Sequence, residues 1–267
     1  MEDPHIPAAF DSVNGLGGLL GYYPARKANR WGNLVVCLLL LAGAVLVFLY
    51  GLYSGFLGYQ LHGPAVIGVK TTAPLLIAVL LSILGLLAGR GAYVNWRKGV
   101  AVYERGFACR DRTGLQTWRW DEILTMTSAV TRHYTNGIYT GTTHRYTLLD
   151  RQNQRLKLVD TIGRVEDLAK VIDTNIFPRL YPRAVDQYNA GELLLFGPVT
   201  ISKQGMTIGK KTYPWGEVKQ VSIHHGTLRV TRKEGGRSSG GRAAASAIPN
   251  IHVLLAIIQQ EVGLKIG

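Results

Sequence analysis

The side chains that could support acid–base chemistry are scattered along the chain. Two pairs of neighbouring carboxylates occur, Asp121-Glu122 and Glu166-Asp167. Neighbours in sequence do not converge on one substrate, and acids in the first turn of a helix interact favourably with its dipole. We therefore interpret both pairs as structural.

Histidine supplies no recognisable metal site either. His224 and His225 are adjacent on an expected strand, so they face opposite sides of it and cannot chelate one metal. His133 and His144 could meet across a hairpin, but no cysteine or carboxylate joins them there, as a zinc site requires. The sequence therefore predicts no metal site.

Cysteine is scarce, which excludes a disulfide scaffold and a cysteine-rich zinc domain. Cys37 lies in an apolar run and cannot pair with Cys109. The neighbouring Arg110 could lower the pKa of the Cys109 thiol, although a small buried core residue is our preferred interpretation. Because the nucleotide-binding and hydrolase motifs are also absent, we expect no catalytic residue, no cofactor and no enzyme activity.

One segment has a charge pattern that suggests a function. Its five cations alternate with glycine and serine: Arg229, Arg232, Lys233, Arg237 and Arg242. Near an anionic membrane leaflet each such cation contributes about 1 kcal/mol of binding. A solvated hairpin tip is the alternative. No aromatic stacking set accompanies the charges, so we expect no nucleic-acid partner.

Composition divides the chain into two environments. The 267 residues are 47% hydrophobic and 18% charged, with a net charge of +13. An average soluble domain has about 25% charged residues. Residues 1–96 have a net charge of only +2 and the remainder +11.

Two stretches are long and apolar enough to cross a membrane. Residues 33–59 carry no charge, and residues 71–95 carry only Arg90. About 20 apolar residues in a helix cross the hydrocarbon core. We predict two transmembrane helices joined by a short extracytoplasmic loop at 60–70, after a mobile N-terminal lead-in of residues 1–32.

The flanking charges predict the orientation of this helical pair. Arg26, Lys27 and Arg30 precede the first stretch, and Arg97 and Lys98 follow the second. Under the positive-inside rule this arrangement places both termini in the cytoplasm and the protein in the plasma membrane as a multi-pass protein.

The apolar stretches resemble an anchor more than a transport pathway. Neither has an Asp, Glu or His at mid-depth, where an ion pathway would need one. Gly51 and Gly55 have the spacing of a helix-dimer motif. We expect them to pack the two helices of one chain together, with a homo-oligomer as the alternative.

After residue 97 the hydrophobic period changes to that of strands, and a pattern occurs twice. Residues 104–107 resemble 203–206, and residues 120–123 resemble 215–218. A hairpin signal at Asn136-Gly137 falls within the first copy. In each copy the strands precede one amphipathic helix, which predicts a duplicated domain.

We place these domains at residues 97–180 and 190–267, with a linker at 178–190 that contains Pro178 and Pro182. Pro178 is expected to end the first amphipathic helix.

This order of elements resembles a known group of domains. A short strand, a glycine–apolar turn, a Trp-x-Glu-Ile/Val motif, further strands and a final helix are similar to bacterial pleckstrin-homology-like (PH-like) domains in uncharacterised membrane-anchored proteins. The second copy, with residues 213–218 and 248–250, is the closer match. The resemblance implies an α+β, mostly β soluble part of two tandem PH-like barrels, each with a C-terminal helix, attached to a two-helix transmembrane hairpin.

PH-like domains bind lipid headgroups or protein segments. We therefore expect a non-catalytic integral-membrane binding or scaffolding protein that contacts anionic lipid or a protein partner. The alternative is a structural membrane protein that forms a homo-oligomer, and an enzyme whose site the sequence does not show is a distant third.

Overall fold

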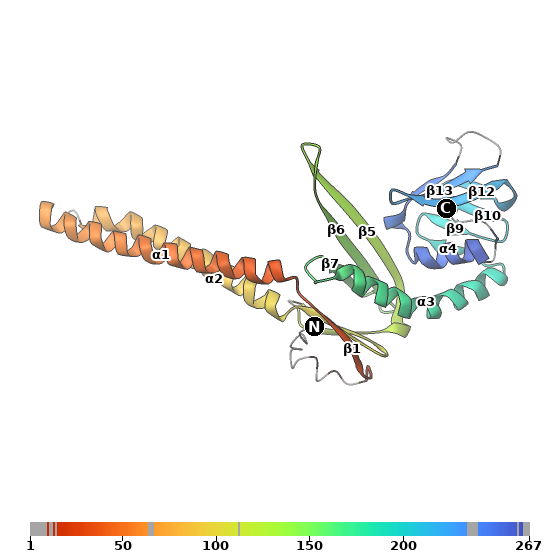
Figure 1. The fold of residues 1–267 in the computed structure, drawn as a ribbon, viewed down its shortest axis with the longest axis horizontal. Helices are drawn as coiled ribbons and strands as arrows, with labels where there is room; N and C mark the ends of the chain where they lie inside the picture. The colour runs from red at the N-terminus through yellow and green to blue at the C-terminus, as the bar shows by residue number, and fades with distance from the viewer. Residues whose placement is uncertain are drawn as a thin grey trace. The chain divides into compact units, whose positions relative to one another are not determined.

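The computed structural model describes residues 10, 13, 15–63, 67–111, 113–233, 240–260 and 262–263 (Figure 1). Its contacts divide the chain into two units. One contains Met1–Ser12, Pro24–Val100 and Cys109–Gln116, and the other contains Val13–Tyr23, Ala101–Ala108 and Thr117–Gly267. Each unit is described separately.

The first unit is built on two long helices, α1 (Lys27–His62) and α2 (Ile67–Arg97). Both are long and apolar enough to cross a membrane. Each extends several residues beyond the predicted stretches. At 1.5 Å per residue they measure about 54 and 46 Å, more than the roughly 30 Å of a hydrocarbon core.

Glycines allow α1 and α2 to approach closely. A Cβ atom added to Gly51 would lie 2.9 Å from Cβ of Pro74, and one added to Gly55 would collide with the Thr71 side chain. Gly85 is similarly close to Leu41. The Gly51–Gly55 pair therefore packs the two helices of one chain together, as the sequence predicts.

The second unit begins with a strand that precedes the helices. Residues Leu19–Pro24 form β1, in a four-stranded sheet of order β1-β2-β3-β4. Beside it, the N–H of Glu104 donates to the Gly18 carbonyl over 3.1 Å. The prediction of a mobile lead-in over residues 1–32 is therefore wrong for residues 19–24, which form a strand. The local sequence does not show this strand, because its partner β2 lies some eighty residues further along the chain.

The first sheet continues with β2 (Gly99–Tyr103), β3 (Gly106–Arg110) and β4 (Leu115–Arg119). A 3₁₀ turn at Trp120–Glu122 leads to a three-stranded sheet of β5 (Ile123–Thr135), β6 (Ile138–Asp150) and β7 (Arg155–Val159). Helix α3 (Val165–Asn189) follows.

The same order is then repeated with shorter elements. A four-stranded sheet contains β8 (Leu194–Phe196), β9 (Val199–Ile201), β10 (Gly205–Ile208) and β11 (Lys211–Pro214). After a 3₁₀ turn at Trp215–Glu217 come β12 (Val218–His224), β13 (Thr227–Arg232) and β14 (Arg242–Ala244). A 3₁₀ turn (Ala245–Ala247) and α4 (Ile251–Gln260) complete the repeat.

The repeats differ in what joins their first two strands. In the second repeat β8 and β9 are separated by only Gly197 and Pro198. In the first repeat the corresponding connection, residues 25–98, contains both long helices. The helical pair is therefore an insertion between the first two strands of a duplicated unit.

Hydrogen bonds support the equivalence of the repeats. The N–H of Trp120 donates to the Arg105 carbonyl over 3.1 Å, and the N–H of Trp215 donates to the Gln204 carbonyl over 3.2 Å. The glycine after each acceptor has no room for a Cβ atom, because a carbonyl of the neighbouring strand lies too close. The repeated Gly and Trp positions thus maintain the same close strand approach twice.

The soluble part is a mixed α+β structure, and no closed barrel occurs among the described strands. The predicted linker at 178–190 is wrong, because α3 continues through Pro178 and Pro182 to Asn189. Its first half buries Leu168 and Ile172 in the first repeat, while its second half packs against the core of the second repeat. Packing on both sides keeps this helix continuous despite the two prolines.

The insertion can be tested by removing it. We expect a variant in which Gly-Pro joins Pro24 directly to Gly99 to fold as a soluble protein. The matched fragment 99–267 lacks β1 and the buried Tyr22 and Leu16. Losing this burial costs about 3 kcal/mol, which lowers Tm by roughly 6–12 °C. Circular dichroism melts would measure the difference, and equal melting of the two proteins would contradict the assignment.

Candidate functional site

The structure describes four of the five predicted cations. Arg229 and Arg232 lie on β13, Lys233 follows that strand, and Arg242 lies on β14. Arg237 falls outside the described residues. Three of these charges, those of Arg229, Arg232 and Arg242, therefore lie on strands of a three-stranded sheet.

Two of these arginines face each other. Arg229 is in register with Arg242 on one neighbouring strand and with Ser222 on the other. Both arginines are exposed, whereas Leu228 and Val230 on the opposite face of β13 are buried. We call Ser222, Arg229 and Arg242 the arginine row.

The arginine row is electrostatically unfavourable by itself. Directly opposed residues on neighbouring strands have Cβ atoms about 5 Å apart, and like charges there destabilise the sheet. Among the described residues no carboxylate forms an ion pair with Arg229 or Arg242. The row is thus suited to an anion that would neutralise both guanidinium groups.

Within the described chain Arg232, unlike Arg229 and Arg242, forms an ion pair with a carboxylate. Its guanidinium donates to the Glu217 carboxylate, and this hydrogen bond raises the pKa of Arg232. The backbone N–H of Lys233 also donates to the Glu217 carbonyl, over 2.8 Å. The positive charge of Arg232 is therefore already compensated within the chain.

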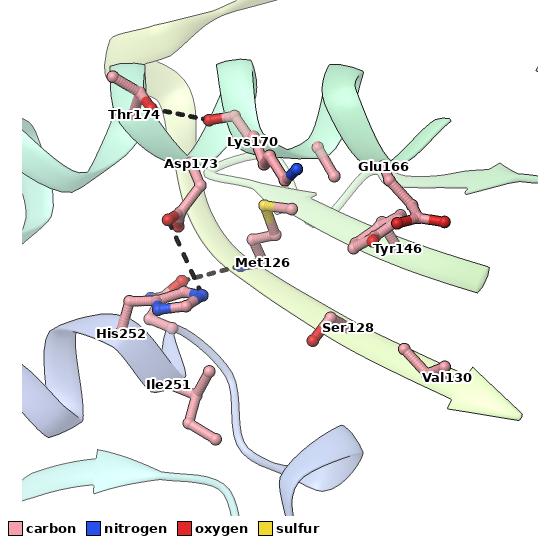
Figure 2. Close-up of a pocket in the computed structure, with 12 residues that line it drawn as sticks. Met126, Ser128, Val130, Tyr146, Glu166, Lys170, Asp173, Thr174, Ile251 and His252 are labelled. Carbon is pink, nitrogen blue, oxygen red and sulfur yellow. Dashed lines mark hydrogen bonds and ion pairs between the residues drawn. The ribbon is translucent and has the colours of Figure 1, made fainter. Parts of the chain in front are cut away.

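A cleft of about 320 Å³ lies among β5, β6, α3 and the start of α4 (Figure 2). Asp173 on α3 and His252 on α4 point toward one another, with Oδ2 and Nε2 3.9 Å apart. Burial raises the pKa of the Asp173 carboxyl, and His252 acts in the opposite direction. Burial also raises the pKa of Tyr146, as do Glu166 and Asp160. Among the described residues, no hydrogen bond joins the Asp173–His252 pair to a serine, threonine or cysteine that could act as a nucleophile.

The two histidines of the long hairpin do not meet. His133 is in register with Gly141 and its Nε2 lies 2.7 Å from the Thr143 hydroxyl. His144 instead has Nδ1 3.3 Å from Asp160 and Nε2 3.2 Å from Glu166. Within the described residues no group of three or more His, Cys, Asp or Glu side chains could hold a metal ion.

Asn250 joins the two repeats. Its N–H donates to the Met126 carbonyl, its Oδ1 accepts from the Met126 N–H, and its Nδ2 donates to the Leu124 carbonyl, each over 2.8 Å. These bonds occupy the edge of β5 that faces away from β6. The sequence places Asn250 in a motif of the repeated fold but does not reveal this role, because nothing local identifies β5 as its partner.

Replacing Asn250 should therefore loosen the connection between the repeats. We expect Asn250→Ala to cost about 1–3 kcal/mol by leaving backbone groups unpaired, in addition to about 1 kcal/mol of strain from alanine at the positive φ of this residue, and to accelerate hydrogen exchange at Met126. Asn175→Ala is the matched control, because the Asn175 amide bonds only within its own helix, to Val171. Equal destabilisation by both variants would contradict the assigned role of Asn250.

Cys109 is not activated by its neighbour Arg110. Burial, with a contribution from Asp111, raises the pKa of the thiol to about 12. Since the thiolate is the reactive form, we expect no reaction of Cys109 with a maleimide at pH 8 until the protein is unfolded. Mass spectrometry would detect the adduct, and rapid modification of Cys109 in the native protein would contradict this.

A family model matches most of the chain. The model of a family of unknown function, DUF6585, matches residues 11–264. No curated protein matches the chain. The family match includes β1, the inserted helices and both repeats, so it follows the whole architecture. The chain belongs to the DUF6585 family of unknown function.

Proposed function

We propose that this protein is a membrane-anchored, non-catalytic binding protein whose two β-rich repeats lie in the cytoplasm. The lengths and apolar surfaces of α1 and α2 support a transmembrane hairpin. The sequence from Lys27 to Arg97 has no Asp or Glu, and the cations Arg26, Lys27, Arg97 and Lys98 lie at the ends that adjoin the β-rich part. The positive-inside rule then favours a cytoplasmic soluble part in the plasma membrane.

The proposal includes a PH-like fold for each repeat. What supports it is the order of four strands, three strands and a final helix, which occurs twice. In the second repeat α4 buries Leu254, Ile257 and Ile258 against the core of the two sheets. A helix that covers the apolar side of bent sheets is the arrangement that the resemblance implies.

The arginine row is the observation that carries the binding function. Two guanidinium groups and a hydroxyl on one exposed face match the geometry and charge of a phosphate or carboxylate group. We favour anionic lipid as the source of this phosphate or carboxylate group, because an anchored domain remains close to a membrane surface. An acidic or phosphorylated protein segment would present the same chemistry.

The oligomer alternative has less support. Gly51 and Gly55, whose spacing suggested helix association, contact Pro74 and Thr71 of the same chain. Their close-packing surface is thus already used within one hairpin.

The proposal predicts salt-sensitive binding to anionic membranes. Full-length protein in phosphatidylcholine nanodiscs would be mixed with vesicles of phosphatidylcholine, with or without phosphatidylserine. At about 1 kcal/mol for each cation, Arg229→Ala with Arg242→Ala should weaken binding to the anionic vesicles about 30-fold.

The matched control is Arg151→Ala with Arg155→Ala, which removes the same charge from two exposed arginines elsewhere. It should change binding only slightly. An equal loss of vesicle binding in both double variants would show that net charge alone is responsible for the binding. Absence of binding to anionic vesicles at low salt would refute the lipid assignment. Retained binding of an acidic peptide would then identify protein as the source of the anion.

A further inference from the structure

The hairpin of β5 and β6 extends beyond the rest of its sheet (Figure 1). Each strand has 13 residues, whereas β7 pairs only with residues 145–149 of β6. The distal part, residues 130–143, is therefore a ribbon of two strands, which we call the hairpin tip. Two-stranded ribbons are marginally stable in water without a further apolar contact.

The hairpin tip exposes large apolar side chains. Val130 is 58% exposed, Tyr134 60%, Ile138 70% and Tyr139 55%. The rings of Tyr134 and Tyr139 lie edge to face with centroids 5.9 Å apart. Clustered exposed apolar groups of this kind mark a contact surface rather than an ordinary solvated loop.

The charge of the hairpin has one sign. Residues 124–149 include no Asp or Glu, while Arg132 and Arg145 are cationic. Both arginines are exposed. The turn of the hairpin is aromatic and aliphatic, and the cations lie further along its strands. This arrangement complements the membrane interface, where tyrosine rings lie at headgroup level and arginines bind lipid phosphates.

We propose that the hairpin tip inserts Tyr134, Ile138 and Tyr139 into the headgroup region of the membrane that α1 and α2 cross. This inference rests on the transmembrane assignment of the proposed function, but it concerns a surface separate from the arginine row. Only Lys98 separates the end of α2 from the start of β2. Such a short tether keeps the β-rich part at a high effective concentration beside the bilayer.

An extended peptide from a partner protein is the alternative ligand of this hairpin. The free edge of β5 beyond Met126 could add a strand from a partner protein. Strand addition would use backbone groups along that edge and gives no reason for exposed apolar side chains at the turn. Insertion into lipid accounts for both the apolar turn and the absence of acids.

The test places an environment-sensitive fluorophore at the tip. Ile138→Cys would be labelled in full-length protein and reconstituted into nanodiscs of phosphatidylcholine and phosphatidylserine. Native Cys37 and Cys109 are buried, so labelling would be selective for the new thiol. We expect blue-shifted emission and several-fold stronger quenching by headgroup-region nitroxide lipid than for Gln152→Cys, an exposed control in the turn between β6 and β7.

Two further variants make the outcome decisive. Adding Tyr134→Ser and Tyr139→Ser should reduce the quenching at position 138, because the anchoring rings are lost. Tyr53→Cys on α1 reports whether the helices span, and should be quenched whatever the hairpin does. If the label at Tyr53→Cys is quenched but the labels at positions 138 and 152 are quenched equally, insertion of the hairpin is refuted and the transmembrane assignment stands. Absence of quenching at all three positions would overturn the transmembrane assignment as well.

Discussion

The pairing of β1 with β2 is the constraint on which the architecture depends. Residues 19–23 precede both long helices and residues 101–103 follow them, yet these strands are neighbours in one sheet. The chain must therefore leave the sheet, form α1 and α2, and return to the adjacent position. Two apolar helices that pack antiparallel satisfy this requirement because such a pair brings its two ends together. The hydrogen bond from the Ala25 N–H to the Lys98 carbonyl closes the insertion at its base.

The second repeat shows what the first would be without the insertion. Its first two strands are joined by two residues, and its later elements follow the same order. Two devices then connect the repeats: the continuous α3, which packs on both cores, and Asn250, which pairs with the edge of β5. Because that edge is occupied near its start, the distal hairpin is left as the uncovered part of the first repeat.

Features with a local signature were predictable from the sequence. The uncharged runs predicted the two helices, the glycine spacing predicted their close packing, and the repeated Gly and Trp positions predicted the duplication. Asn136-Gly137 likewise predicted the turn between β5 and β6. Each of these signals lies within a few residues of the structure that it specifies.

Features that depend on distant partners were not predictable. β1 is recognised as a strand only once β2 is in place, and α3 passes through Pro178 because packing on both sides supports it. The basic residues were found, but their roles depend on register, which opposes Arg229 to Arg242 and places Arg232 beside Glu217. The PH-like assignment and the binding function remain predictions, because the family match names neither.

The architecture requires that a strand before the helices completes a sheet whose other strands follow them. Hydrogen–deuterium exchange of the full-length protein in nanodiscs would measure whether this strand pairing exists. Because β1 is an edge strand with β2 as its one neighbour, we expect protection at the alternate amides of residues 19–23 that bond to β2, and at the amides of residues 101–103. Rapid exchange of all amides in residues 19–23, with protected amides in residues 101–103, would contradict this pairing and would show that the N-terminal segment is not part of the sheet.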